Sequence, residues 1–474
     1  MLRLTSFSTT DNNISNPLLF QNKVDFENLS RIANCSVEEI CNKKSSSILL
    51  FPQDWQLGVK KRGIAQPICS LHQKGTGYEL NTGNVMGYVG VTNNAGQSTE
   101  LKISSRFGDT QNDFFLNYML AKVCNLNVVN LRFSNSKNNF HDLLIFLFPR
   151  MLNEALSQGM YKQYEWHNYN DANVKGPIDV KRHIRCNIPF AGKIAYTARE
   201  YSYDNNVTEL IRHTIEYLRI KVNGSYILNC NTETKENIAK IISATKNYKK
   251  SDLQKVLQKN QKQVSHPYFT KYRPLQILCK MILLNKFSSF GCGRNKIYGV
   301  LFDGSWLWEE YIAKVFEENK TGINHKTGCD KLFVKDDIGQ NQGIIPDFIR
   351  YENKPLTALF LGDTKYKHVD TNASYNRENY FQIITYMYRY SCRTGYLIFP
   401  YDKNADENQF LRKEFGYERR RIIAGKENYT LEKDSNSSKV IELGLQIPQD
   451  STEFVIFAKK MKDFELKLCL HLKF

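Results

Sequence analysis

Paired cysteines are missing from this sequence. The eleven cysteines are scattered and odd in number, and no Cys-x-x-Cys pair occurs among them. Zinc sites and iron–sulfur clusters are built from closely spaced cysteines, so we expect neither in this protein. A scattered set of cysteines also indicates a reducing compartment, in which thiols stay free.

Long hydrophobic runs are missing as well. The longest one, Leu143 to Pro149, is far shorter than the roughly 20 residues of a membrane-spanning helix. The first residues, Met1 to Ser6, lack the apolar stretch of a signal peptide. We therefore expect a cytoplasmic protein without a membrane partner.

The sequence also lacks a phosphate-binding loop. No Gly-x-x-x-x-Gly-Lys-Ser/Thr motif occurs, and Ala191-Gly192-Lys193 has neither the upstream glycine nor the following hydroxyl residue. Since this loop holds the nucleotide phosphates in many motor proteins, we expect that the chain does not power movement along DNA by itself.

Negative charge is in deficit. The 65 Lys and Arg residues outnumber the 48 Asp and Glu residues, which gives a formal net charge of +17. Such a surplus attracts polyanions through phosphate contacts that do not depend on base sequence and that weaken with salt. DNA is therefore the partner that the charge favours.

Hydrophobic patterning divides the chain into several parts. Short β-like stretches such as Val85 to Val91 alternate with turns up to about residue 110, and helical spacing of apolar residues follows. A last strand is expected at Glu453 to Phe457. We predict an α/β multidomain protein with a β-rich N-terminal domain (1–110), a helical middle region (111–290) and a C-terminal α/β domain (291–474).

Two acidic motifs of the C-terminal domain carry the strongest chemical signal. Pro346-Asp347 precedes Asp363-Thr364-Lys365, which ends the apolar run Thr357 to Leu361. Asp363 and Lys365 project from the same side of a strand, and Asp347 joins them if Ile344 to Tyr351 is the neighbouring strand. Two carboxylates supply the oxygen ligands that Mg²⁺ prefers, and a nearby ammonium group holds water and offsets phosphate charge. The pattern predicts a metal-dependent nuclease site.

A second Asp-x-Lys triplet, Asp179-Val180-Lys181, must be weighed against the first. It follows the turn-like Lys175-Gly176-Pro177 rather than a strand-like run, and no Pro-Asp dipeptide precedes it. The context therefore favours Asp363 as the catalytic aspartate.

Two helices are expected beside the site. Glu378 to Tyr390 has helical spacing and carries Gln382 and Tyr386 side by side, either to contact DNA or as part of a helix that packs its aromatic face on the sheet. Upstream, Trp306 to Ile312 offers Glu309, preferred over Glu310, as a third metal-binding carboxylate, although both glutamates also fit a solvated surface.

Together these residues resemble the McrC family, the nuclease subunit of McrBC-type and LlaJI-type restriction systems. The resemblance covers roughly residues 80 to 400 and includes Gly176 to Arg182, Leu307-Trp308-Glu309-x-Tyr311 and Asp363 to Lys367. Trp308 departs from it, because a smaller aromatic residue is expected there.

The resemblance implies a C-terminal restriction-endonuclease-like domain of the PD-(D/E)xK superfamily. Its implied metal ligands for Mg²⁺ are Asp347, Asp363 and Glu309, and Lys365 is the implied catalytic lysine. The remaining residues of the implied site, which bind DNA or support it, are Gln382, Tyr386 and Lys367.

The resemblance also implies a partner and a biological role. The chain would assemble with a hexameric McrB-like AAA+ motor that uses GTP or ATP, stimulate its hydrolysis, and cut foreign DNA. The β-rich residues 1–110 would dock on that motor. Three other readings stay open: a stand-alone RecB-like exonuclease, which shares the Gln-x-x-x-Tyr pair, a catalytically inactive scaffold that couples DNA to an ATPase, and a plain nucleic-acid-binding protein.

Overall fold

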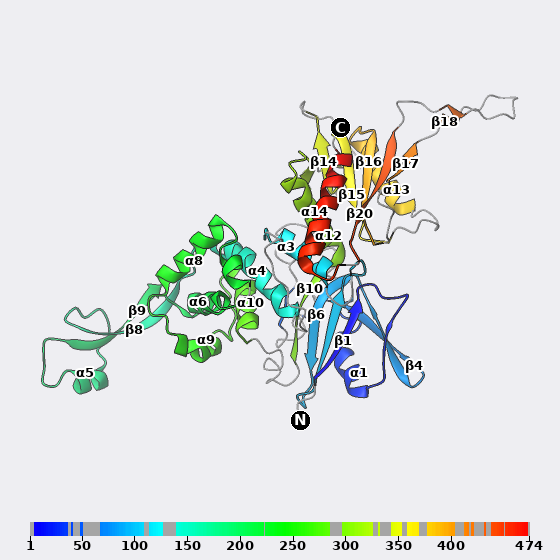
Figure 1. The fold of residues 1–474 in the computed structure, drawn as a ribbon. Coiled ribbons are helices and arrows are strands. Elements are labelled where there is room, and N and C mark those ends of the chain that lie inside the picture. The colour runs from blue at the N-terminus through cyan, green and yellow to red at the C-terminus, as the bar shows by residue number, and fades with distance from the viewer. Residues whose placement is uncertain are drawn as a thin grey trace, which may run out of the picture. The chain divides into compact units, whose positions relative to one another are not determined.

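The protein is a mixed α/β chain with several sheets, as predicted (Figure 1). A computed structural model describes residues 4–36, 39–40, 48–50, 67–108, 113–126, 139–221, 223–284, 296–325, 330–331, 343–352, 358–368, 377–402, 412–416, 419–420, 431–432, 438–449 and 451–472. Contacts divide the chain into two compact units, one made of Met1–Lys137 with Gly291–Phe474 and the other of Asn138–Phe290.

A five-stranded mixed sheet opens the first unit. In the order of pairing its strands are β1 (Leu4–Thr10), β7 (Ser98–Ser104), β6 (Val85–Thr92), β10 (Lys296–Asp303) and β3 (Ile48–Leu50). The strand β10 pairs with β6 along its whole length, from Lys296 to Asp303. The division into three domains stays a prediction, and this sheet joins a strand from beyond residue 290 to strands from before residue 110.

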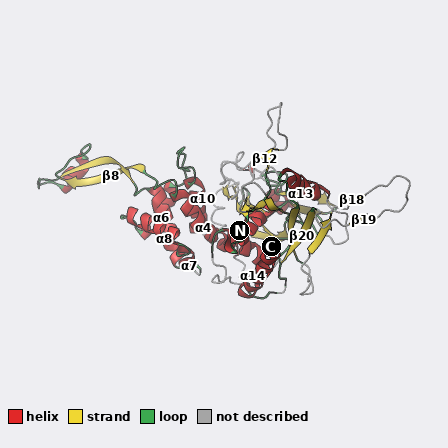
Figure 2. Cartoon of the chain, turned by 90° about the horizontal axis from the view of Figure 1, so that it is seen from above, coloured by secondary structure: helices red, strands yellow, loops and turns green. Residues whose placement is uncertain are grey.

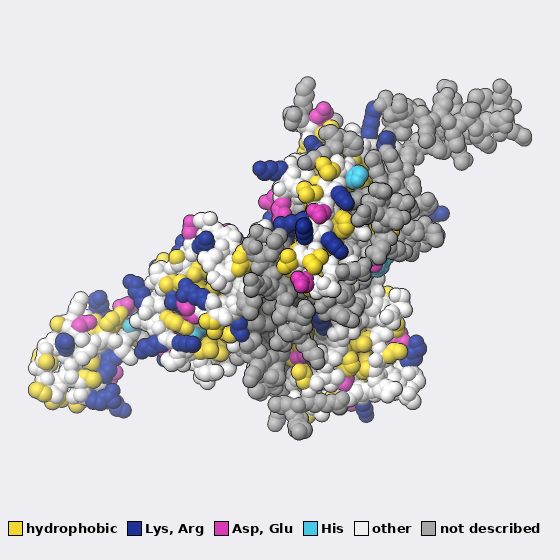
Figure 3. All heavy atoms as spheres, in the orientation of Figure 1, with side chains coloured by type: hydrophobic (Ala, Val, Ile, Leu, Met, Phe, Trp, Pro, Cys, Tyr) yellow, Lys and Arg dark blue, Asp and Glu magenta, His cyan; other side chains and the backbone are white. Residues whose placement is uncertain are grey.

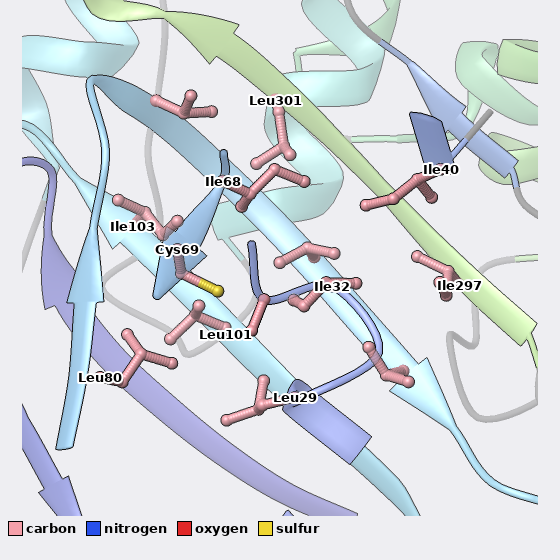
Figure 4. Packing of buried hydrophobic residues seen from close by; sticks show 14 of the residues in the cluster. Leu29, Ile32, Ile40, Ile68, Cys69, Leu80, Leu101, Ile103, Ile297 and Leu301 are labelled. Carbon is pink, nitrogen blue, oxygen red and sulfur yellow. The ribbon is translucent and has the colours of Figure 1, made fainter. Parts of the chain in front are cut away.

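Apolar side chains close the space between this sheet and a smaller one. The smaller sheet has the strands β2 (Leu18–Phe20), β5 (Gly77–Thr82) and β4 (Cys69–Lys74), and helix α1 (Lys23–Leu29) lies beside it in the chain. Figure 4 shows the shared core, in which Leu29, Ile68, Leu80 and Leu101 are completely buried. Burial of these side chains stabilises the N-terminal part of the unit.

A six-stranded sheet forms the C-terminal part of the first unit. In the order of pairing its strands are β11 (Asn324–His325), β14 (Phe348–Tyr351), β15 (Ala358–Thr364), β16 (Thr394–Tyr401), β20 (Lys439–Gln446) and β17 (Arg412–Gly416). The central strands β15, β16 and β20 run parallel, and the outer strands pair antiparallel. Parallel strands are covered on both faces, which is why β16 and β20 are buried almost throughout.

Helices cover both faces of this sheet. Figure 2 shows α13 (Arg377–Arg389) and α14 (Phe454–His471) on opposite sides of it. On the α14 side, Glu465 accepts hydrogen bonds from Tyr118 of α3 (Phe114–Val123) and Tyr311 of α12 (Gly304–Glu318), at 2.8 and 2.7 Å. Two short strand pairs complete the described strands of the unit: β12 (Asp330–Lys331) with β13 (Gly343–Ile344), and β18 (Arg419–Arg420) with β19 (Leu431–Glu432).

The predicted final strand is wrong. The buried residues of this segment follow the i, i+3, i+4, i+7 pattern of the helix α14; they are Phe454, Phe457, Ala458, Met461, Glu465, Leu468 and Cys469. The expected strand covered only the start of this pattern.

The second unit is mainly helical. Its helices are α4 (Asn139–Leu156), α6 (Asn206–Arg219), α7 (Gly224–Leu228), α8 (Thr232–Ala244), a 3₁₀ turn (Lys250–Asp252), α9 (Leu253–Lys259) and α10 (Tyr272–Leu284). Asn205 caps α6 by accepting hydrogen bonds from the backbone of Val207 and Thr208, and Leu210, Ile211 and Leu218 form part of its buried face.

A long hairpin extends from the helices of the second unit and was not predicted. The strands β8 (Gln163–Asp171) and β9 (Ile194–Ser202) pair antiparallel, and α5 (Val180–Cys186) lies between them in the chain, at the far end (Figures 1 and 2). We call residues 163–202 the arm.

Along the described residues, no helix is long and apolar enough to span a membrane.

Candidate functional site

The two motif aspartates meet at one end of the strands β14 and β15. Phe348 pairs with Gly362, so Asp347 and Asp363 lie at the same end of this antiparallel pair. Thr364 holds Asp347 in place: its backbone N–H and its hydroxyl both donate to Oδ2 of Asp347, at 2.8 Å. The residue between Asp363 and Lys365 on β15 therefore joins the two acidic motifs.

Several carboxylates lie close together in the site, and their like charges affect one another. Asp363 is only 2% exposed. Burial, together with the negative charges of Asp363 and Glu309, raises the pKa of Asp347 well above its usual range. Hydrogen bonds from Thr364 oppose this shift. The site thus concentrates negative charge that a cation would neutralise.

Lys365 lies at the centre of a chain of polar contacts. Its ammonium group forms an ion pair with Oδ2 of Asp363 and donates a hydrogen bond to Oε1 of Gln382 at 2.8 Å. Gln382 in turn donates from Nε2 to the hydroxyl of Tyr386, also at 2.8 Å. The structure therefore brings together four of the predicted site residues, Asp363, Lys365, Gln382 and Tyr386, across β15 and α13.

Glu309 approaches the same acids from α12. Its charge acts on Asp347, whereas Glu310 is not among the groups that shift the pKa of Asp347. Oε1 of Glu309 lies 3.0 Å from Nε2 of His325, whose ring stacks on Phe348 at a centroid distance of 5.3 Å. His325 was not predicted, because it lies in a two-residue strand with no motif around it.

Two predicted candidates lie away from these contacts. Lys367 is exposed just beyond β15, where its side chain is available to a ligand at the surface. In the second triplet, Asp179 caps the short helix α5 by accepting a hydrogen bond from the backbone of Arg182 at 3.1 Å. Asp179 belongs to the second unit, whereas β15 belongs to the first.

The acids fit a hard divalent cation. Carboxylate oxygens are the ligands that Mg²⁺ prefers, and the like charges around Asp347 oppose its ionisation unless a cation offsets them. Across the described residues, no three His, Cys, Asp and Glu side chains meet as a ready metal cluster. The three-acid ligand set of Asp347, Asp363 and Glu309 accordingly stays a prediction.

Comparison with known proteins gives one family. Residues 80–400 match the model of the McrBC 5-methylcytosine restriction system component. A search of curated proteins finds no match.

Two solved assemblies from Thermococcus gammatolerans are also similar to this chain. The first is a refined half-complex from a tetradecameric assembly of McrB AAA+ hexamers with bound McrC; the match has 12% identity and a TM-score of 0.41, and it covers 84% of this chain and 85% of that one. The second is the McrBC complex, with 12% identity, a TM-score of 0.28, and coverage of 68% of this chain and 88% of that one.

Proposed function

Since the chain belongs to the family of McrBC 5-methylcytosine restriction system components, as its sequence predicted, we propose that it is the metal-dependent DNA nuclease subunit of such a system. The observation that supports this most directly is the contact chain from Asp363 through Lys365 to Gln382, next to Asp347. A restriction-endonuclease-like PD-(D/E)xK domain is the architecture that this arrangement of strands and residues favours.

The residues of the chain divide the chemistry among them. Asp347 and Asp363, with Glu309, would hold Mg²⁺, which when bound polarises a phosphoryl oxygen and lowers the pKa of a bound water. Lys365 has three N–H donors, and two of them are directed to Asp363 and Gln382. The third is left for the attacking water or a phosphate oxygen, so the lysine both orients the nucleophile and offsets charge.

The positions of these groups are fixed before DNA binds. Thr364 holds the carboxylate of Asp347 through two hydrogen bonds, and Gln382 holds the ammonium group of Lys365. Side chains that are already in place lose little freedom when the reaction begins, and this lowers the barrier to hydrolysis.

Plasmid cleavage tests the proposed function. The purified protein is incubated with plasmid DNA in Mg²⁺ or in EDTA, alone and with a McrB-like AAA+ protein, here called the AAA+ neighbour, plus GTP or ATP. Asp363→Ala removes the central carboxylate, and Asp463→Ala, at an exposed position of α14, serves as the matched control. We expect cleavage that needs Mg²⁺, the neighbour and a nucleotide, and that only Asp363→Ala abolishes.

Other outcomes of this experiment would support one of the alternative functions. Cleavage by the protein alone with Mg²⁺ would favour a stand-alone RecB-like exonuclease or an endonuclease without a motor. DNA binding without cleavage under any condition would assign the chain to the inactive scaffolds.

We also propose that the arm is the surface that binds a hexameric McrB-like AAA+ GTPase or ATPase. Large apolar side chains are exposed along it and at its far end, where α5 and its flanking loops add Lys and Arg (Figure 3). These side chains are Tyr164, Trp166, Val174, Ile178, Val180, Ile184, Ile188, Phe190 and Tyr201. Within the described part of residues 1–110, by contrast, the exposed large apolar residues are Leu4, Ile14 and Leu19. An exposed apolar surface of this size is typical of a protein interface.

Substitutions on the arm test this docking surface. Trp166→Ala combined with Phe190→Ala should weaken binding of the AAA+ neighbour and reduce the stimulation of its GTP or ATP hydrolysis, because both side chains are more than half exposed and available to a partner. Tyr268→Ala is the control, at an exposed aromatic outside the arm. Unchanged binding of the neighbour by the double variant would exclude the arm as the docking surface.

A further inference from the structure

Two large aromatic side chains project into solvent from α13. Phe381 is 65% and Tyr388 is 82% exposed. One of the two interpretations of this helix, left open by the sequence, placed its aromatic face on the sheet. The residues that pack on the sheet are instead Ile383 and Met387, which are buried against Gly395 of β16. A Cβ atom added to Gly395 would come within 2.8 Å of Ile383 and 2.6 Å of Met387. The aromatic pair, Phe381 and Tyr388, therefore lies on the side of the helix that faces away from the sheet.

The two rings share one face of the helix. Seven residues are close to two helical turns, so Phe381 and Tyr388 lie about 10 Å apart along the axis. Thr385 lies between them, and its hydroxyl donates to the backbone oxygen of Phe381 at 2.7 Å. Because this hydroxyl is bonded to the backbone, the surface of α13 between the two rings carries only the small side chain of Thr385. This leaves room for a flat ligand group between Phe381 and Tyr388.

The aromatic pair is next to the candidate catalytic residues. Gln382, which accepts the hydrogen bond from Lys365, directly follows Phe381, and Tyr386, which accepts from Gln382, is two residues before Tyr388. A strand of DNA whose phosphate lies at Lys365 thus has the exposed face of α13 within reach of its neighbouring nucleotides.

We propose that Phe381 and Tyr388 stack on unpaired bases of a DNA strand beside the cleavage site, an inference that rests on the proposed nuclease function. Aromatic rings bind the flat faces of bases with little dependence on sequence, and those faces are accessible only where the duplex is open. The distance of about 10 Å along the helix matches roughly three base steps of 3.4 Å.

Charge on the neighbouring surface favours nucleic acid as the occupant. Arg377 is exposed at the first residue of α13, and Lys367 is exposed just beyond β15. These cations are suited to the phosphates on either side of stacked bases. The consequence for the enzyme is a preference for DNA whose strands are locally separated, such as a bubble or a fork.

Binding measurements without cleavage test the stacking. The full chain is kept in EDTA, and its affinity is measured by fluorescence anisotropy for a single-stranded oligonucleotide and for the matching duplex. The double variant Phe381→Ala with Tyr388→Ala should bind the single strand at least about tenfold more weakly and the duplex with unchanged affinity. Leu466→Ala with Leu470→Ala, at exposed positions of α14, should change neither.

A second probe separates stacking from a general loss of affinity. With 2-aminopurine in the single strand, stacking on the aromatic pair should quench its fluorescence in the unsubstituted protein and in Phe381→Trp, but not in the double alanine variant. Equal weakening of single-strand and duplex binding, or no weakening at all, would overturn the proposal. So would loss of AAA+ partner binding by the double variant with intact DNA binding, which would assign the pair to a protein interface.

The outcomes for the stacking and for the nuclease are distinguishable. Stacking is read from binding in EDTA, and hydrolysis is read from plasmid cleavage with Mg²⁺. If the double alanine variant loses affinity for the single strand alone and no cleavage occurs, the stacking proposal is supported and the nuclease proposal is rejected. If cleavage depends on the metal but the double alanine variant binds the single strand as well as the unsubstituted protein does, only the stacking proposal is rejected.

Discussion

The ring of Tyr366 lies beneath the guanidinium group of Arg106, with 4.8 Å between the guanidinium carbon and the ring centroid. Tyr366 follows Lys365 in the chain, and Arg106 follows the strand β7 of the N-terminal sheet. The hydroxyl of Tyr366 lies 2.7 Å from Oγ of Ser105, and burial raises its pKa well above the usual range. The N-terminal sheet therefore anchors the residue next to the candidate catalytic lysine.

The same part of the sheet also anchors the start of α12. Nδ2 of Asn84 donates to Oγ of Ser305 at 2.7 Å, and the backbone oxygen of Asn84 accepts from Gly304 at 3.0 Å. Arg106 contacts the side chain of Asn84 as well. Since α12 carries Glu309, the N-terminal sheet supports the candidate site through two separate elements.

Arg106→Met should destabilise the protein strongly. Arg106 forms an ion pair with Asp11, at 2.6 Å between Nη2 and Oδ2, and Asp11 is completely buried. Removing the cation leaves a buried carboxylate without its charge partner, which typically costs about 3–5 kcal/mol. Urea unfolding of the variant should show a loss of this size in the free energy of unfolding.

A double substitution provides the control for this effect. Asp11→Asn with Arg106→Met removes both charges, so much of the lost stability should return. If the double variant is as unstable as Arg106→Met alone, the packing of the arginine rather than its charge maintains the junction.

Local patterns allowed part of the site to be predicted. Asp363 and Lys365 were proposed as a pair because alternation along a strand is a property of neighbouring residues, and Gln382 with Tyr386 because of the helical repeat. Local patterns could not predict the contacts of Arg106 with Tyr366 or of Asn84 with Ser305. Those contacts join segments that are far apart in sequence, and no local period records them.

Competing local signals explain the errors in the predicted fold. The arm was missed because helical patterns surround it, although Gln163 to Asp171 alternates in the manner of a strand and places Tyr164 and Trp166 on one face. The sequence left open whether the aromatic face of α13 packs on the sheet, as such faces usually pack against a core, and only the structure shows that Phe381 and Tyr388 are exposed. Both departures from the local pattern coincide with surfaces that we propose to bind a partner.

Asp303 should make stability depend on pH. It caps α12 by accepting a hydrogen bond from the backbone of Trp306, and burial, with lesser contributions from the charges of Glu309 and Asp11, raises its pKa to about 6. Between its unfolded pKa of 3.8 and about 6, the folded state holds a proton that the unfolded state has lost. The free energy of unfolding should therefore fall by about 3 kcal/mol as the pH rises through this window, and stay level above it.

Asp303→Asn isolates this contribution, because asparagine is an equally good helix cap and carries no charge. The two proteins should be equally stable below about pH 4, and the variant should be the more stable one above about pH 6. Chemical unfolding at several pH values measures the difference. A difference that does not vary with pH would contradict the raised pKa of Asp303.

Lys365→Met should strengthen metal binding while it abolishes cleavage. The ammonium group of Lys365 is paired with Asp363, so it competes with a cation for the same carboxylate. Its removal leaves the acids more negative and also removes the group that orients the attacking water. Calorimetric titration with Mg²⁺ or Mn²⁺ should show a tighter site in this variant and a weakened one in Asp363→Ala.

The second Asp-x-Lys triplet supplies the control for metal binding. Lys181→Met and Asp179→Ala alter the same motif at exposed or partly exposed positions of α5 and should leave the titration unchanged. Weaker metal binding by Lys365→Met would show that the lysine helps to build the metal site rather than compete for it.

Gln382 and Tyr386 should differ in their effect on cleavage, because they stand at different distances from Lys365. Gln382→Ala removes the acceptor of the lysine at 2.8 Å, and the ammonium group is then held by Asp363 alone. Loss of such a supporting hydrogen bond typically costs ten- to a hundredfold, here expected in kcat. Tyr386→Phe removes the hydroxyl to which Gln382 donates and leaves the hydrogen bond between Lys365 and Gln382 in place, so it should cost less. Asp463→Ala, at an exposed position of α14, is the control. Equal losses for Tyr386→Phe and Gln382→Ala, accompanied by a raised KM, would instead place the tyrosine hydroxyl on the DNA.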